Sequence, residues 1–303
     1  MDVHLPVIQK NHMRSLNEIL LPIDFSPRSL EVARYAVGVA RRFHSKITVL
    51  HVFPPLNPAW VAMGHAMAID ELTVRQKDEV YTRLNSFLPD NLHDVDVKRL
   101  VVEGEPAQVI ADCVAGERID LIMMPTRGCS AFRRFLLGSV TAKVLHDAIC
   151  PVWTSSHISD DHSALFVTPK VIVCAIDPTP EGNVILPWAS ELAADLQARL
   201  IVVHAIPSLQ SNPETYYLEG DLRRDLKAEA HARILKILQN SRTPDAEIRV
   251  EGGNVSSVVH SAVEDIKADL LVIGRSLDSG LLGRLRTHSY TLIRESSCPV
   301  ISI

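Results

Sequence analysis

The stretch Asp120-Leu121-Ile122-Met123-Met124-Pro125-Thr126-Arg127-Gly128 decides the fold. Its first part is a short, continuous apolar run, which is typical of a strand buried on both faces of a parallel sheet. A turn with Pro125 and Gly128 follows, and a helical pattern begins at Gly138-Ser139. A glycine and a serine at a helix start present N–H groups, a hydroxyl and the positive end of the helix dipole, which together suit an anion. A glycine turn with a serine cap explains this stretch equally well.

Alternating strand and helix patterns surround this stretch. Apolar runs predict strands over residues 19–24, 47–52, 97–102, 121–124 and 151–153. After the first run, Ser26-Pro27 supplies a helix cap and a proline at the first helical position. Helical patterns also separate the later runs. This order predicts an open parallel α/β sheet.

The same pattern begins again about 150 residues later. Several segments match earlier counterparts: 171–177 with 19–24, 200–205 with 47–52, 270–274 with 121–125, and 298–300 with 150–152. Thr179-Pro180 also repeats the Ser-Pro cap. Matches in the same order predict a tandem repeat. We therefore expect two tandem, open-twisted, parallel five-stranded sheets of the Rossmann-like kind, with helices on both faces.

The repeat sets the expected domain organisation. A chain of 303 residues is long for one core, and each repeat has the size of a typical domain. We expect a leader over residues 1–16, a first domain over 17–154, a polar linker over 155–169 and a second domain over 170–303.

Composition and charge exclude several classes of protein. The net charge of −5 offers no excess of positive charge to neutralise phosphates, so we expect no nucleic-acid partner. The sequence has neither an apolar signal-peptide core nor an apolar run of about 20 residues, so we expect a cytoplasmic protein without a membrane partner. The five cysteines form no CxxC pair, which argues against a zinc site or a redox pair.

The strand order places several polar or turn residues at one edge of the first sheet. Ligands of open α/β sheets bind beyond the carboxyl ends of the strands, near the switch in strand order. Asp24, Val52 and the turn from Pro125 to Gly128 should therefore surround one crevice. Asp24 suits a hydrogen bond from a ligand, although it would also suit the cap of the next helix. The chain has no GxxxxGK[ST] motif and no GxGxxG after the first strand, which argues against P-loop NTPases and dinucleotide dehydrogenases.

These residues give the chain its resemblance to a family. From Leu16 to Ile303 it resembles the universal stress proteins in their tandem form. ATP-binding members carry Gly-x-x-Gly, nine residues, then Gly-Ser or Gly-Thr, and here nine residues separate Gly128 from Gly138-Ser139. Pro125 replaces the first glycine. The family's aspartate near adenine matches Asp24, and nearby family positions match Pro22 and Val52.

The resemblance implies that the first domain binds ATP or a related adenine nucleotide as a regulatory ligand, with or without Mg²⁺. Adenine would lie near Asp24 and Val52, and the phosphates near Gly128, Gly138 and Ser139. The expected nucleotide-binding residues are Pro22, Asp24, Val52, Pro125, Arg127, Gly128, Gly138, Ser139 and Val140. Pro125 has a fixed φ and no N–H, so it would crowd a backbone contact to ribose unless that contact uses the carbonyl.

The second repeat departs from the family pattern. No glycine follows Gly274 by three residues, and Arg286-Thr287 replaces the Gly-Ser element. Asp278 would also repel an anion, although Asp177 remains. We therefore expect a second domain that binds no nucleotide and forms an intramolecular pseudo-dimer with the first. In family members the final strands pair across the dimer axis, and a further homodimer of tandem chains is left open.

Two other functions are compatible with the sequence. One is a stress-response interaction module that acts without a nucleotide, which Pro125 and the altered second repeat favour. The other is a slow ATP hydrolase or an autophosphorylating protein, with Ser139 as a phosphoryl acceptor. We assign no catalytic or metal-binding residue, because the histidines form no recognisable triad or metal cluster with cysteines or carboxylates.

Overall fold

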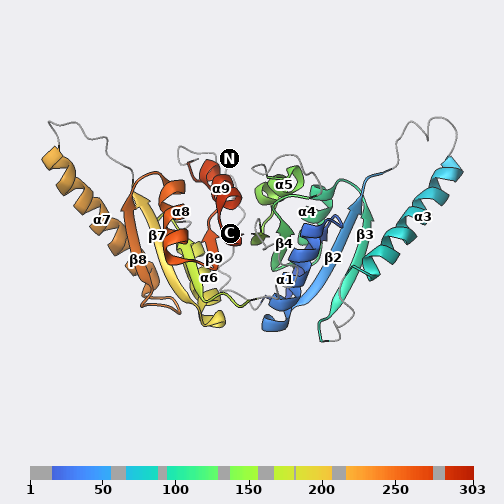
Figure 1. The fold of residues 1–303 in the computed structure, drawn as a ribbon, viewed down its shortest axis with the longest axis horizontal. Coiled ribbons are helices and arrows are strands. Elements are labelled where there is room, and N and C mark those ends of the chain that lie inside the picture. Colours follow the sequence, from blue (N-terminus) through green and yellow to red (C-terminus); the bar gives the residue numbers. More distant parts are fainter. Residues whose placement is uncertain are drawn as a thin grey trace, which may run out of the picture. The chain divides into compact units, whose positions relative to one another are not determined.

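A computed structural model describes residues 16–55, 66–87, 94–128, 137–155, 167–180, 182–206, 216–275 and 284–303. The chain forms two compact units, one over Leu16–Val167 and one that contains Thr168–Ile303 (Figure 1). Of the expected leader and linker, residues 1–15 and 156–166 lie outside the described residues. Among the described residues, no helix is long and apolar enough to cross a membrane.

The first unit is a five-stranded parallel sheet with helices between its strands. The elements in chain order are β1 (Glu18–Ile23), α1 (Pro27–Phe43), β2 (Lys46–Phe53), α3 (Ala66–Asn85), β3 (Val97–Glu103), α4 (Pro106–Gly116), β4 (Leu121–Pro125), α5 (Ser139–Asp147) and β5 (Val152–Ser155). Within this unit the strands lie in the order β3-β2-β1-β4-β5. Each neighbouring pair is parallel.

The second unit repeats this topology. Its elements are β6 (Val171–Ala175), α6 (Gly182–Leu196), β7 (Arg199–Ile206), α7 (Tyr216–Leu238), β8 (Glu247–Gly252), α8 (Val255–Ile266), β9 (Leu270–Ile273), α9 (Arg284–Glu295) and β10 (Val300–Ser302). The strands within this unit lie in the order β8-β7-β6-β9-β10, again all parallel. The predicted fold class is therefore confirmed.

Helices cover both faces of each sheet. Connections between parallel strands are right-handed, so the strand order puts α1 and α3 on one face of the first sheet and α4 and α5 on the other. The contacts agree, since α4 packs on α5 in the first unit and α8 on α9 in the second (Figure 1). In the second unit α6 also packs on α7. All five residues of β4 are buried, as its continuous apolar run predicts.

The strand order switches between β1 and β4. The chain runs outward from β1 through β2 to β3 and then returns to place β4 on the other side of β1. Ile19 pairs with Leu121 and Leu20 with Ile122, so the two strands end at the same edge. This carboxyl edge is where doubly wound sheets form their ligand crevice.

Two helix starts in the second unit differ from the predictions. Helix α6 begins at Gly182, so Thr179-Pro180 lies before the helix and does not place a proline at its first position. There the Thr179 N–H donates to the Asp177 carbonyl at 2.8 Å. Pro178 and Pro180, on either side of Thr179, restrict the backbone φ of this segment. Helix α9 begins at Arg284, so Arg286-Thr287 lies inside the helix and not at its start.

Candidate functional site

Asp24 follows β1 and is bonded to the first turn of α1. Its Oδ1 accepts hydrogen bonds from the Ser26 N–H at 3.0 Å and the Ser29 hydroxyl at 2.5 Å. Ser26 is the N-cap of α1, and its hydroxyl oxygen accepts from the Ser29 N–H at 3.1 Å. The predicted alternative role of Asp24 at the helix start is therefore present, and it uses Oδ1.

The other carboxylate oxygen of Asp24 lies against Gly128. A Cβ atom added to Gly128 would stand 2.1 Å from Asp24 Oδ2, so no side chain fits there unless the carboxylate moves. Asp24 follows β1 and Gly128 lies in the turn after β4, and these neighbouring strands flank the switch in strand order. The structure thus brings together two predicted residues that are about a hundred positions apart.

Gly138 closes the same turn from the other side. Its N–H donates to the Thr126 carbonyl at 2.9 Å, and an added Cβ would lie 3.3 Å from the Arg127 Cα. Gly138 is the N-cap of α5 and Ser139 is its exposed first residue, so the alternative of a serine cap is wrong. Among the described residues, no side chain caps α5. A helix start of this kind presents backbone N–H groups to an anion.

Pro125 is the buried last residue of β4. Its ring removes one N–H from the sheet only at the point where the strand ends. Its carbonyl accepts a hydrogen bond from the Thr141 hydroxyl at 3.1 Å. In the second unit the Ser289 hydroxyl donates to the Gly274 carbonyl at the same distance. A ribose contact through the Pro125 carbonyl would therefore have to use its second lone pair.

The remaining predicted residues lie around this turn. Pro22 pairs with Leu50, so continuing the register places Val52 level with Asp24 at the carboxyl edge. Pro22 and Val52 are both half-buried. Arg127 and Val140 are also half-buried, in the turn after β4 and the first turn of α5. The direct contacts thus join the residues after β1 and β4, while Pro22 and Val52 flank them.

An aromatic cluster beside Asp24 is a feature that the sequence reasoning missed. Phe25 adopts a left-handed backbone with a φ of 58°. Its ring centroid lies 4.5 Å from that of His51 and 5.4 Å from that of Phe87, and the Arg83 guanidinium lies 4.3 Å from it. The sequence pattern that could have indicated this cluster is an aromatic residue directly after Asp24 together with a histidine on the next strand.

His51 anchors this cluster to β1. Its Nδ1 lies 2.9 Å from the Ile23 carbonyl, a contact in which Nδ1 carries the proton and donates it. Burial lowers the pKa of His51 below its usual value, and the Arg83 guanidinium lowers it further, against opposing effects of the Ile23 carbonyl and Asp24. His204 makes the same bond to the Ile176 carbonyl at 2.9 Å, so both units carry this strand contact.

The second unit has a different loop after its first strand. Pro178 follows Asp177, and a proline ring holds φ near about −65°, so the left-handed turn of Phe25 is closed to it. Gly182 stands at the position that corresponds to Ser29, and an added Cβ would lie 2.4 Å from the Asp177 carbonyl oxygen. Asp278 lies outside the described residues, and so does most of the turn after Gly274.

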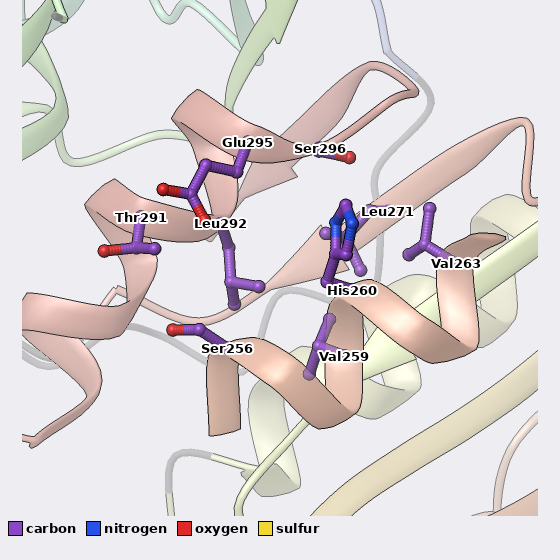
Figure 2. Close-up of a pocket in the computed structure, with 9 residues that line it drawn as sticks. All are labelled: Ser256, Val259, His260, Val263, Leu271, Thr291, Leu292, Glu295 and Ser296. Atoms are coloured by element: carbon purple, nitrogen blue, oxygen red, sulfur yellow. The ribbon is translucent and has the colours of Figure 1, made fainter. Parts of the chain in front are cut away.

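A small cavity lies elsewhere in the second unit, between α8 and α9. Figure 2 shows Val259, His260 and Val263 of α8 facing Leu292 and Glu295 of α9. Its volume of about 10 Å³ suits one water molecule and is far too small for a nucleotide. The cavity adjoins the last turns of α9 and therefore does not coincide with the predicted site.

A serine–histidine pair lies elsewhere in the second unit. The Ser256 hydroxyl lies 2.9 Å from His288 Nδ1 in the second unit. This pair joins α8 to α9. Among the described residues, no three or more His, Cys, Asp or Glu side chains gather to hold a metal ion.

The fold and the edge contacts define the class of the chain, a protein of two repeated, doubly wound parallel α/β units. The family model described as the universal stress protein family matches residues 16–155 and 169–303. The chain therefore belongs to the universal stress protein family, as the resemblance predicted.

Relatives match one repeat or the whole chain. A universal stress protein of Methanocaldococcus jannaschii is 30% identical over 147 residues, which cover 48% of this chain and 85% of that protein. A universal stress protein of Mycolicibacterium smegmatis is 24% identical over 291 residues, which cover 94% of this chain and 96% of that protein. The second relative therefore matches the chain across both repeats.

Solved structures show the same fold over nearly the full length. A universal stress protein of Archaeoglobus fulgidus has a TM-score of 0.62 at 21% identity, covering 95% of this chain and 96% of its own. A functionally unknown protein of Pseudomonas aeruginosa has a TM-score of 0.64 at 19% identity, covering 96% and 93%.

Proposed function

We propose that the first unit binds ATP or a related adenine nucleotide as a regulatory ligand. The observation that carries this proposal is the convergence of Asp24, Gly128 and Gly138 at the switch point of the sheet. Asp24 Oδ2 lies where a Gly128 side chain would stand, and Gly138 packs on the turn that carries Gly128. The carboxyl edge at such a switch is the usual ligand crevice of doubly wound sheets.

Each side of this site suits one part of a nucleotide. The uncapped start of α5 offers N–H groups and the exposed Ser139 hydroxyl to phosphates, and Arg127 adds positive charge. Asp24 and Val52, level with each other at the strand ends, offer a hydrogen-bond acceptor and an apolar contact to adenine. Pro22, Pro125 and Val140 complete the lining, and any Mg²⁺ would accompany the phosphates.

The second unit is proposed as a pseudo-dimer partner that binds no nucleotide. Pro178 and Gly182 change the loop that follows its first strand. Arg286 lies inside α9 where the first unit has Gly138 before its helix. We also propose that the two domains span residues 17–154 and 170–303. The protein would act in the cytoplasm, without a nucleic-acid or membrane partner.

Isothermal titration of Mg-ATP tests the proposed site. We expect one nucleotide per wild-type chain and an affinity at least about tenfold lower in Gly138→Arg, because the new side chain fills the space beside Arg127. Gly116→Arg is the matched control, since an added Cβ there meets nothing within 4 Å.

The outcomes separate the alternative functions. A wild-type chain that binds no nucleotide would contradict the proposal and favour an interaction module. Unchanged binding by Gly138→Arg would place the ligand elsewhere, and two nucleotides per chain would contradict the role of the second unit. Phosphate release measured on the same samples tests for slow ATP hydrolysis.

A further inference from the structure

We propose that Ser29 is a positioning residue, which holds the Asp24 carboxylate in the orientation that receives the nucleotide. This inference rests on the proposed function of the first unit. Ser29 lies in the first turn of α1 and is 1% exposed, so its role would be to orient Asp24 from behind and not to contact the ligand.

The Ser29 hydroxyl forms a closed pair of bonds with Asp24. The Asp24 N–H donates to Ser29 Oγ at 3.2 Å, and the hydroxyl donates to Asp24 Oδ1 at 2.5 Å. The same oxygen also accepts a hydrogen bond from the Ser26 hydroxyl at 3.3 Å, and the one proton of the Ser29 hydroxyl is donated to the carboxylate. A hydrogen bond to an ionised carboxylate is among the strong ones in proteins. The pair thus fixes both the backbone and the side chain of Asp24.

This orientation determines where the second carboxylate oxygen lies. Asp24 is exposed as a residue, so its side chain would sample several rotamers without a fixed partner. With Oδ1 bonded to Ser29 and to the Ser26 N–H, Oδ2 is directed to Gly128 at the switch point. A carboxylate that is already oriented loses less conformational freedom when a ligand binds.

The neighbouring backbone makes this arrangement possible. Phe25, between Asp24 and Ser26, has a φ of 58°, and this turn brings the Ser26 N–H and the start of α1 back to Asp24. The contacts of the Phe25 ring with His51 and the Arg83 guanidinium hold that turn in place. A left-handed conformation at a bulky residue persists only where its surroundings determine it.

The second unit provides an internal comparison. Gly182 occupies the position of Ser29 and has no hydroxyl, and the Asp177 carbonyl oxygen fills the space that a side chain would need. Pro178 replaces Phe25 and cannot form the left-handed turn. The second repeat, which lacks the Gly-Ser element, therefore also lacks the hydroxyl and the turn that orient the aspartate in the first unit.

A double-mutant cycle tests the inference. Mg-ATP affinity is measured by titration for the full chain and for Ser29→Ala, Asp24→Ala and the double variant. We expect Ser29→Ala to weaken binding about three- to tenfold, and to add less than about twofold in the Asp24→Ala background, because its effect acts through Asp24.

Ser26→Ala is the matched control. It removes another buried hydroxyl from the same turn, weakens the cap of α1 and deletes the bond from the Ser26 hydroxyl to Ser29 Oγ. It keeps the two groups that bond the Asp24 carboxylate, the Ser26 N–H and the Ser29 hydroxyl. We expect both serine variants to lower the unfolding temperature, and only Ser29→Ala to lower the affinity more than twofold at a temperature where all variants are folded.

Each contrary outcome has a separate meaning. Three outcomes would overturn the role of Ser29 and leave the proposed function standing. They are wild-type affinity in Ser29→Ala, equal losses of affinity in both serine variants, and a full additional loss of affinity in the double variant. A wild-type chain that fails to bind Mg-ATP would overturn the proposed function, and this inference with it.

Discussion

Gly128 shows how closely single residues are packed at the proposed site. In Gly128→Ala, the new methyl carbon would stand 2.1 Å from Asp24 Oδ2 and displace the carboxylate. We expect an affinity for Mg-ATP lower by about tenfold, or about 1.4 kcal/mol. The free energy of unfolding should also fall, by about 1–2 kcal/mol, because the displaced carboxylate weakens its bonds to Ser29 and to the Ser26 N–H. Titration and urea unfolding measure both, with Gly116→Ala as the control in open space.

The backbone of Phe25 can be tested separately from its ring. Phe25→Gly removes the ring but allows the φ of 58°, whereas Phe25→Pro removes the ring and excludes that conformation. We expect Phe25→Pro to be less stable than Phe25→Gly by roughly 1–3 kcal/mol and to bind Mg-ATP more weakly. Equal behaviour in urea unfolding and titration would show that the ring, and not the turn, determines both properties.

His51 makes the stability of the first unit depend on pH. Its pKa in the folded chain is lowered from the ordinary value of 6.5, so the unfolded chain binds more protons between the two values. The contribution of His51 to stability is therefore present above about pH 6.5 and is lost as the pH falls through the lowered pKa. His51→Asn removes this titration and keeps an N–H near the Ile23 carbonyl. On acidification we expect the free energy of unfolding, measured with urea, to fall more in the wild type than in the variant. Parallel curves of unfolding free energy against pH would contradict this.

At the scale of elements, one aspartate in each unit anchors the start of the first strand. Asp120 Oδ2 accepts hydrogen bonds from the Asn17 and Glu18 N–H groups at 2.8 and 3.0 Å. Asp269 Oδ2 accepts from Lys170 and Val171 at 2.8 and 2.9 Å. Each carboxylate therefore ties β4 or β9 to the neighbouring β1 or β6.

Removal of either aspartate should destabilise the unit that contains it. We expect Asp120→Ala and Asp269→Ala each to cost about 1–2 kcal/mol, because two backbone N–H groups lose a charged acceptor. The asparagine variants, which keep one acceptor oxygen, should cost less. Calorimetry measures the changes, and a larger loss in the asparagine variants would contradict the explanation.

The sequence predicted the elements better than their junctions. The buried run of β4 and its repeat predicted both sheets, because a strand buried on two faces needs continuous apolar residues. The predicted start of α6 at Thr179-Pro180 is wrong. Pro178 restricts the backbone of the same turn, and the helix begins at Gly182. The left-handed φ of Phe25 depends on contacts with His51 and Arg83, and such distant contacts leave no local pattern.

For the whole molecule, the two units share a topology but differ at the proposed site. The topology depends on strand patterns that both repeats retain, whereas the site depends on Ser29 and Gly138, which the second repeat replaces by Gly182 and Arg286. A duplicated fold can thus keep its sheet while only one copy keeps the residues that would orient a ligand. We therefore expect the nucleotide to stabilise the first unit and not the second, because a ligand stabilises only the folded unit that binds it.

Calorimetry of the full chain with Mg-ATP tests this difference. Asp120→Ala and Asp269→Ala identify the unfolding transitions of the first and second units, because each variant weakens a bond within one unit. At a nucleotide concentration of about 100 times Kd, we expect about 2.7 kcal/mol of added stability in the transition that Asp120→Ala lowers. The transition that Asp269→Ala lowers should stay within about 1 °C of its position without nucleotide, because we propose that the second unit binds none. Equal shifts of both transitions would show that the second unit binds the nucleotide or unfolds together with the first.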